Sequence, residues 1–113
     1  DWKTTQREKQ MLQLQQSVIE TRRAELELNL SILLSRQQKL IDQLKELIAG
    51  DQELVMLREK ISRASAAKLE HGTITSSGYL LDLNAETAAK INLETRKMKL
   101  IEAILTYNTL KGF

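Results

Sequence analysis

The sequence predicts an all-α fold, a long antiparallel coiled-coil hairpin in which the first helix is longer than the second. Three observations lead to this prediction. The 113-residue chain has no proline and only four glycines, a composition that suits long uninterrupted helices. Leucine and isoleucine recur at seven-residue intervals, which is typical of coiled coils. A short stretch of glycine, threonine and serine separates two helical patterns and predicts a reversal of the chain.

The heptad pattern covers most of the first helix. One row keeps the same seven-residue interval without a miss: Leu12, Ile19, Leu26, Leu33, Leu40, Leu47, Leu54 and Ile61. A second row lies one residue further along, at Leu34, Ile41, Ile48 and Val55, while Leu30, Gln37, Leu44 and Asp51 share a third phase. A strict repeat over so many turns forces helices to supercoil around one another. We therefore expect one helix over residues 3–70, although Gly50 followed by Asp51 is a weak point at which it could bend or break.

The turn is expected at residues 71–75, with the second helix over residues 76–110. Gly72 is the natural end of the first helix because glycine adopts the left-handed conformation without a Cβ penalty. Thr73, Thr75 and Ser76 can cap the free N–H groups of the next helix. The second helix places its apolar residues on one broad face: Leu80, Leu83, Ile91, Met98, Ile101 and Leu105. Toward the far end this face is widened by Leu93, Leu100, Ile104 and Tyr107.

Small residues gather on both sides of the turn. They predict that the two helices pack most tightly near the tip, at Ala64, Ala66, Ala67, Ala85, Ala88 and Ala89. Farther from the tip the two helices differ in length, so the second covers only residues 35–70 of the first. The apolar row over residues 12–33 is then left uncovered, and we expect a second copy or other parts of a larger protein to bury it. We accordingly expect residues 1–113 to form a single coiled-coil hairpin that is a fragment of a larger protein.

Several functional classes lack support in the sequence. The net charge is +2 and acidic and basic residues are interleaved, whereas a nucleic-acid site needs a basic stripe. With no cysteine and one histidine, no metal site or other cofactor is expected. Ser76 and Ser77 have no general base in reach and are expected to be capping residues, so no enzymatic activity is predicted. No apolar run is long enough for a transmembrane helix.

Three stretches carry a resemblance to a known family. They are LREKI at 57–61, LEHGTIT at 69–75 and YLLDLNAET at 79–87, and the ending YNTLKG at 107–112 adds to them. Together they resemble the TolC-type outer-membrane efflux channel family. The resemblance covers nearly the whole chain and is strongest from Leu54 onward. Its heptads are generic, but the combination of G-T-x-T with Y-L-x-x-L-N-A in a helical turn is more specific.

The resemblance implies a location and a role. Members of this family are trimers in which an outer-membrane β-barrel continues into a periplasmic α-helical barrel, so this chain would be one hairpin of that helical barrel. It would form part of a passive conduit for efflux or secretion, and its tip would contact a periplasmic adaptor protein that joins the channel to an inner-membrane pump. The matching tip residues are His71, Gly72, Thr73, Ile74, Thr75, Ser76, Ser77, Gly78 and Tyr79.

One departure from the family concerns charge at the tip. Many members carry an acidic residue in the first turn of the second helix, where this sequence has Gly78. The capping pattern that begins at Thr75 therefore lacks its acidic half. Asp82 is left as the candidate for a carboxylate at the pore tip, and Ile74 replaces an arginine found in some relatives.

Two other interpretations remain open. The chain could be a soluble coiled-coil interaction module, or the helical hairpin of the periplasmic adaptor itself. Alternating amphipathic strands in the flanking sequence would favour the channel, and β-sandwich patterns would favour the adaptor. An isolated hairpin could also pair with a second copy in a non-native dimer or bundle.

Overall fold

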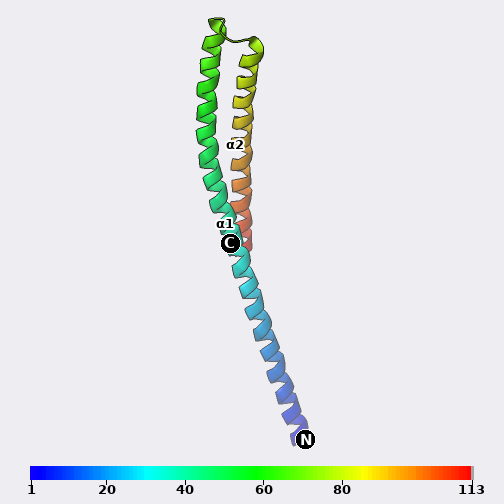
Figure 1. Cartoon of the computed structure of the whole chain (residues 1–113). Coiled ribbons are helices and arrows are strands. Elements are labelled where there is room, and N and C mark those ends of the chain that lie inside the picture. Colours follow the sequence, from blue (N-terminus) through cyan, green and yellow to red (C-terminus); the bar gives the residue numbers. More distant parts are fainter. Residues whose placement is uncertain (113) are drawn as a thin grey trace. The chain divides into compact units, whose positions relative to one another are not determined.

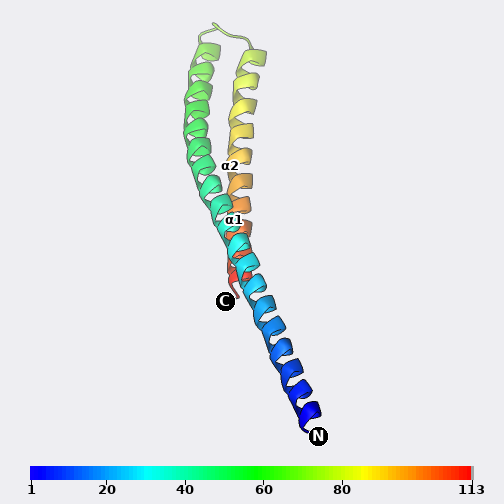
Figure 2. The same cartoon turned by 60° about the horizontal axis from the view of Figure 1, so that its bottom comes forward.

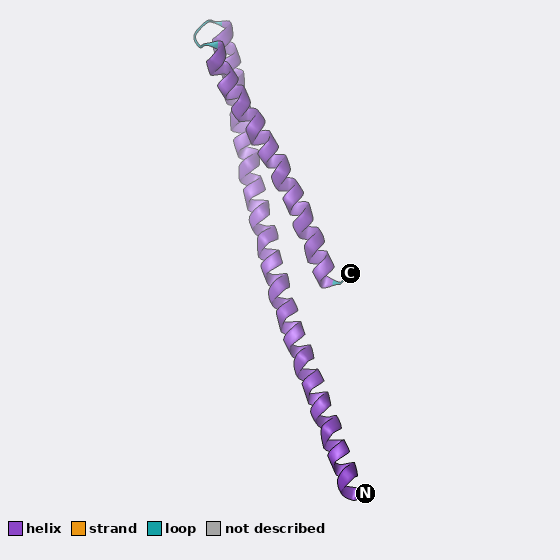
Figure 3. Ribbon diagram, turned by 90° about the vertical axis from the view of Figure 1, so that its right-hand side faces the viewer, coloured by secondary structure: helices purple, strands orange, loops and turns teal. Residues whose placement is uncertain are grey.

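The computed structural model describes residues 1–112 and contains two α-helices. Helix α1 spans Trp2–Glu70 and helix α2 spans Ser76–Lys111. The loop between them covers residues 71–75 (Figure 3). No strand occurs among residues 1–112. The predicted all-α hairpin is therefore confirmed, and the helix boundaries agree with the predicted ones to within one residue.

Helix α1 continues through Gly50 without a break. A Cβ atom placed on Gly50 would meet nothing within 4 Å, so the position is not required by close packing. The heptad phase passes through Gly50 unshifted, and the contacts on both sides of it keep the helix continuous despite the cost of glycine.

The chain divides into two units, residues 1–36 and the residues from Gln37 onward. In the first unit every side chain is exposed except that of the half-buried Leu34. The apolar row predicted to be uncovered is indeed exposed within this unit: Leu12, Ile19, Leu26 and Leu33. Residues 1–36 thus carry an apolar row without a core of their own.

The second unit is an antiparallel helical hairpin. Two views show α2 running back beside the green part of α1 (Figure 1 and Figure 2). The side chains that α1 buries or half-buries against α2 alternate at intervals of three and four residues, which is the spacing of a coiled-coil seam. They include Gln37, Ile41, Leu44, Ile48, Asp51, Val55, Arg58, Ser62, Ser65 and Leu69. The corresponding positions in α2 are Asp82, Glu86, Ala89, Leu93, Arg96, Leu100, Ala103, Tyr107 and Leu110.

The apolar part of this seam consists of two clusters. In one, Ile48 and Val55 of α1 pack with Ala89 and Leu93 of α2. In the other, Ile41 and Leu44 pack with Ala103, and the half-buried Tyr107 lies against them. Leu100 contacts both clusters and joins them. The hairpin is therefore held by apolar contacts between residues 41–55 and residues 89–103.

The structure shows which of the apolar rows lies between the helices. The seam uses the second row of α1, which contains Ile41, Ile48 and Val55, whereas most of the first row is exposed at Leu40, Leu47 and Leu54. In α2 the predicted face is likewise mostly exposed, at Leu80, Ile91, Met98, Ile101 and Leu105. On α1 the two apolar rows are adjacent, whereas on α2 the row of Ile91, Met98 and Leu105 is two residues away from the seam positions and lies on the opposite face. Periodicity alone does not tell which row faces the other helix.

Candidate functional site

The predicted site begins at the end of α1, where backbone hydrogen bonds close the helix. Gly72 has a φ of 73°, in the left-handed region that favours glycine. The Thr73 N–H donates to the Lys68 carbonyl at 2.8 Å, and the Gly72 N–H donates to the Leu69 carbonyl at 3.0 Å. This is the Schellman arrangement, in which the last carbonyls of a helix are satisfied by the reversing chain. Gly72 therefore ends α1, as predicted from the sequence.

The start of α2 is capped by a side chain of the turn. Thr75 is the N-cap residue, and its hydroxyl oxygen accepts a hydrogen bond from the Gly78 N–H at 3.1 Å. Of the three residues predicted as candidate caps, Thr75 fills this role, while Thr73 donates its hydroxyl to the Lys68 carbonyl. The first turn of α2 contains no acidic residue, so this cap has no reciprocal acidic partner. Both helix ends at the tip are thus fixed by local hydrogen bonds.

The tip residues differ in how far they are exposed. Among the nine residues predicted as the contact surface, six are exposed: His71, Gly72, Thr73, Thr75, Ser76 and Ser77. The remaining three, Ile74, Gly78 and Tyr79, are half-buried. A Cβ placed on Gly78 would lie 3.4 Å from the Thr75 hydroxyl oxygen, so Gly78 lies close against the cap. The tip therefore presents small polar side chains on a turn with defined backbone geometry.

The contacts near the tip are not made by the alanines that the sequence suggested. Ala64, Ala66, Ala67 and Ala88 are exposed, Ala85 is half-buried and Ala89 is buried. Only Ala89 belongs to a core cluster. For the contact between α1 and α2, the expectation of tight alanine packing is therefore wrong at the four exposed alanines. The physical reason is the choice of stripe, because the seam passes through Ser62 and Ser65 instead.

Ser62, Ser65 and Asp82 form a polar cluster at this part of the seam, named the clasp here. Both serines are buried and Asp82 is half-buried. The Ser65 hydroxyl donates to the Asp82 carboxylate, and the Ser62 hydroxyl donates to the Asp82 backbone carbonyl at 3.2 Å. Asp82, the candidate for a pore carboxylate, thus accepts a hydrogen bond from the facing helix within the hairpin.

A second polar contact crosses the seam farther from the tip. Arg96 Nε of α2 lies 2.5 Å from Asp51 Oδ2 of α1, and both side chains are largely buried. The side-chain amide of Asn92 donates to the same carboxylate at 3.4 Å. Asp51 therefore pairs with an arginine of α2 across the hairpin, and α1 does not break at this position.

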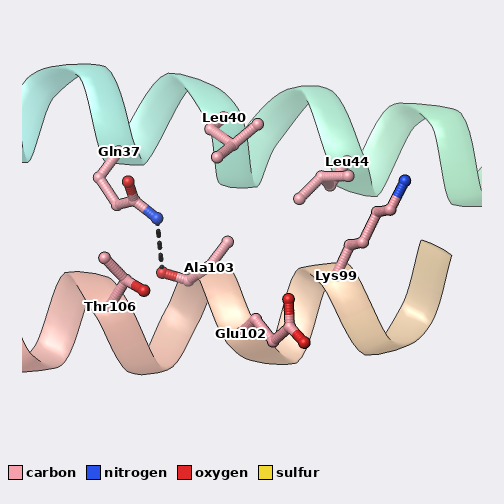
Figure 4. Close-up of a pocket in the computed structure, with 7 residues that line it drawn as sticks. All are labelled: Gln37, Leu40, Leu44, Lys99, Glu102, Ala103 and Thr106. Carbon is pink, nitrogen blue, oxygen red and sulfur yellow. Dashed lines mark hydrogen bonds between the residues drawn. The ribbon is translucent and has the colours of Figure 1, made fainter. Parts of the chain in front are cut away.

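A shallow open groove of about 330 Å³ lies along the seam near the end of α2. The side-chain amide of Gln37 donates to the Ala103 carbonyl at 3.0 Å across it (Figure 4). Leu40, Leu44, Lys99, Glu102 and Thr106 complete its lining. Since Leu40 belongs to the exposed row of α1, this groove joins the seam to the exposed apolar stripe.

The described residues contain no group suited to bind a metal ion. No cluster of three or more histidine, cysteine, aspartate or glutamate side chains with metal-binding geometry occurs within residues 1–112. Neither described helix has a stretch apolar enough and long enough to span a bilayer.

Sequence reasoning missed the two serines and the ion pair. A signal for them existed, because Ser62 continues the row of Ile41, Ile48 and Val55 at the same seven-residue interval. Ser65 continues the phase of Leu44 and Asp51 in the same way. This signal is weak because serine is mostly found at exposed positions.

Comparisons with known proteins leave the family open. No protein-family model matches the chain, and neither the curated proteins nor the solved structures include a significant match.

Proposed function

We propose that this chain is a periplasmic segment of the α-helical barrel of a trimeric outer-membrane efflux or secretion channel. In this role the hairpin catalyses no reaction and contributes to the wall of a passive conduit. Its tip docks a periplasmic adaptor that belongs to an inner-membrane pump. The proposal combines the resemblance of residues 57–61, 69–75 and 79–87 to TolC-type channels with one structural observation.

That observation is the second apolar stripe on each helix of the hairpin. On α1 the stripe contains Leu40, Leu47 and Leu54, and on α2 it contains Ile91, Met98 and Leu105. Each set repeats every seven residues, as the buried seam does. A hairpin that acts alone needs one seam, whereas this one exposes a second set of large apolar residues on both helices.

The geometry of a helix explains what the second stripe is suited for. Rows one residue apart, such as those of Leu40 and Ile41, lie about 100° apart around an α-helix. A helix with two such stripes can pack against two neighbours, one along each stripe. That is the requirement for helices arranged side by side in a wall, and it favours a barrel segment over a hairpin that is isolated in solution.

The tip has features that suit a docking surface. Gly72 and Thr75 fix the backbone on both sides of the turn, so a partner meets a preorganised surface. The exposed Thr73, Ser76 and Ser77 offer small hydrogen-bonding groups. An adaptor with a complementary helical tip could engage them without a large rearrangement.

In-cell photo-cross-linking tests the docking proposal. A photoreactive amino acid would replace Thr73 or Ser77 at the tip, with Glu46, an exposed residue far from the turn in the sequence, as the control position. We expect the tip positions, but not the control, to cross-link to a membrane-anchored periplasmic protein through a helical hairpin of that protein. Cross-links only to cytosolic proteins would overturn the proposal. Cross-links from the tip to an outer-membrane channel would identify this chain as the adaptor hairpin instead.

A further inference from the structure

The hairpin is held differently in its two halves. Residues 41–55 and 89–103 contain both apolar clusters and are named the base here. Residues 56–88 are named the tip half, and Ser62 and Ser65 are the only buried residues that they contribute among the described residues. Apolar packing therefore dominates in the base, whereas the clasp lies at the centre of the tip half.

We propose that the clasp of Ser62, Ser65 and Asp82 is a conformational latch at which the tip half opens while the base stays closed. Its two hydrogen bonds join α1 to α2 near the turn. The inference concerns the hairpin itself and does not depend on the proposed channel function.

The energetics of polar contacts support local opening. When the tip half separates, the serine hydroxyls and the aspartate carboxylate regain hydrogen bonds to water, so each protein hydrogen bond contributes only about 0.5–1.5 kcal/mol net. Separation of the base instead exposes several large apolar side chains, each worth about 1.5–3 kcal/mol when fully buried. Opening at the clasp therefore costs less than opening at the base.

The same contacts make the closed state specific. A shift of one helix along the other would move Asp82 away from Ser65 and leave a half-buried carboxylate without its donor. Unpaired polar groups in such positions are costly, whereas apolar contacts tolerate a shift more easily. The clasp thus fixes how α2 is aligned with α1 in the closed hairpin, while the free-energy cost of opening the tip half stays low.

Hydrogen–deuterium exchange of the purified 113-residue chain, resolved by peptide, tests this inference. Ser65→Ala removes the donor and leaves the Asp82 carboxylate unpaired. We expect amide exchange in residues 56–88 to become about five- to thirtyfold faster, with exchange in the base unchanged. Ser35→Ala, at an exposed serine of α1, is the matched control and should leave both halves unchanged.

The double variant Ser65→Ala/Asp82→Ala completes a double-mutant cycle with the two single variants. Both partners of the hydrogen bond are absent in the double variant. Its tip half should therefore exchange more slowly than expected if the free-energy effects of the two single variants simply added. Additive effects would overturn the latch. So would equal acceleration of the tip half and the base, or no acceleration at all. These measurements need no membrane or partner, so their outcome is independent of the channel proposal.

Discussion

Arg96 of α2 and Asp51 of α1 form an ion pair across the hairpin, with Nε and Oδ2 2.5 Å apart. On α1, Asp51 lies between Ile48 and Val55 of one apolar cluster. Arg96 Nη2 adds a longer contact of 3.5 Å to the other carboxylate oxygen. Charged pairs of this kind are directional, whereas leucine contacts are not. The pair therefore favours the observed alignment of α2 with α1.

Removal of this ion pair should destabilise the hairpin. Arg96→Met keeps most of the apolar stem but leaves the largely buried Asp51 carboxylate without its positively charged partner. We expect a loss of about 1–2 kcal/mol in the free energy of unfolding, measured by urea denaturation. Arg63→Met is the control, because Arg63 and Glu59 form an exposed pair at 3.9 Å, and its effect should be smaller than about 0.5 kcal/mol. Equal losses in both variants would contradict this assignment.

A second prediction distinguishes the buried stripe from the exposed one. Leu44 is 7% exposed and Leu47 is 48% exposed, although the two lie one turn apart on α1. Leu44→Ala should lower the free energy of unfolding by about 2–4 kcal/mol, because it leaves a cavity against Ala103. Leu47→Ala should cost less than about 1 kcal/mol within one hairpin. Thermal unfolding followed by circular dichroism would measure both, and a larger effect at Leu47 would show that the stripes are wrongly assigned.

Two glycine substitutions should have opposite signs. Gly50 lies inside α1 with open space around it, so Gly50→Ala should raise the free energy of unfolding by about 1 kcal/mol. Gly72 has a φ of 73°, so Gly72→Ala should lower it by about 1–2 kcal/mol. Chemical denaturation of both variants checks the pair. A stabilising Gly72→Ala would mean that the turn does not adopt the left-handed geometry.

The helix cap at Thr75 gives a fourth prediction. Thr75→Ala removes the oxygen that accepts from the Gly78 N–H, and we expect a loss of about 1 kcal/mol in the free energy of unfolding. Thr75→Ser keeps the accepting oxygen and should retain most of the stability. If serine were as destabilising as alanine, packing of the threonine methyl group would be the cause in place of the hydrogen bond.

The helices and the turn could be predicted from the sequence because their signals are local. Gly72 and Thr75 specify a helix end and a helix start through their own backbone and side-chain chemistry. The absence of proline and the continuous heptads predicted one uninterrupted α1, even through Gly50. None of these features depends on residues distant in the chain.

The contacts between the helices were harder to predict. Leu40 and Ile41 belong to neighbouring rows of equal periodicity, and only the position of α2 decides that Ile41 is buried. The polar residues of the seam, Ser65 among them, gave a weak signal because serine is usually exposed. Asp82 was expected at a pore, and its contact with Ser65 depends on the register of the hairpin, which local sequence does not specify.

Location and assembly state in cells test the central claim most directly. Membranes would be fractionated and probed with an antibody against residues 60–90, with each fraction run in mild detergent before and after heating. The account predicts an outer-membrane band at the mass of a trimer that converts to monomer on heating. A soluble protein, or one confined to the inner membrane, would contradict the channel and favour a coiled-coil module or an adaptor hairpin.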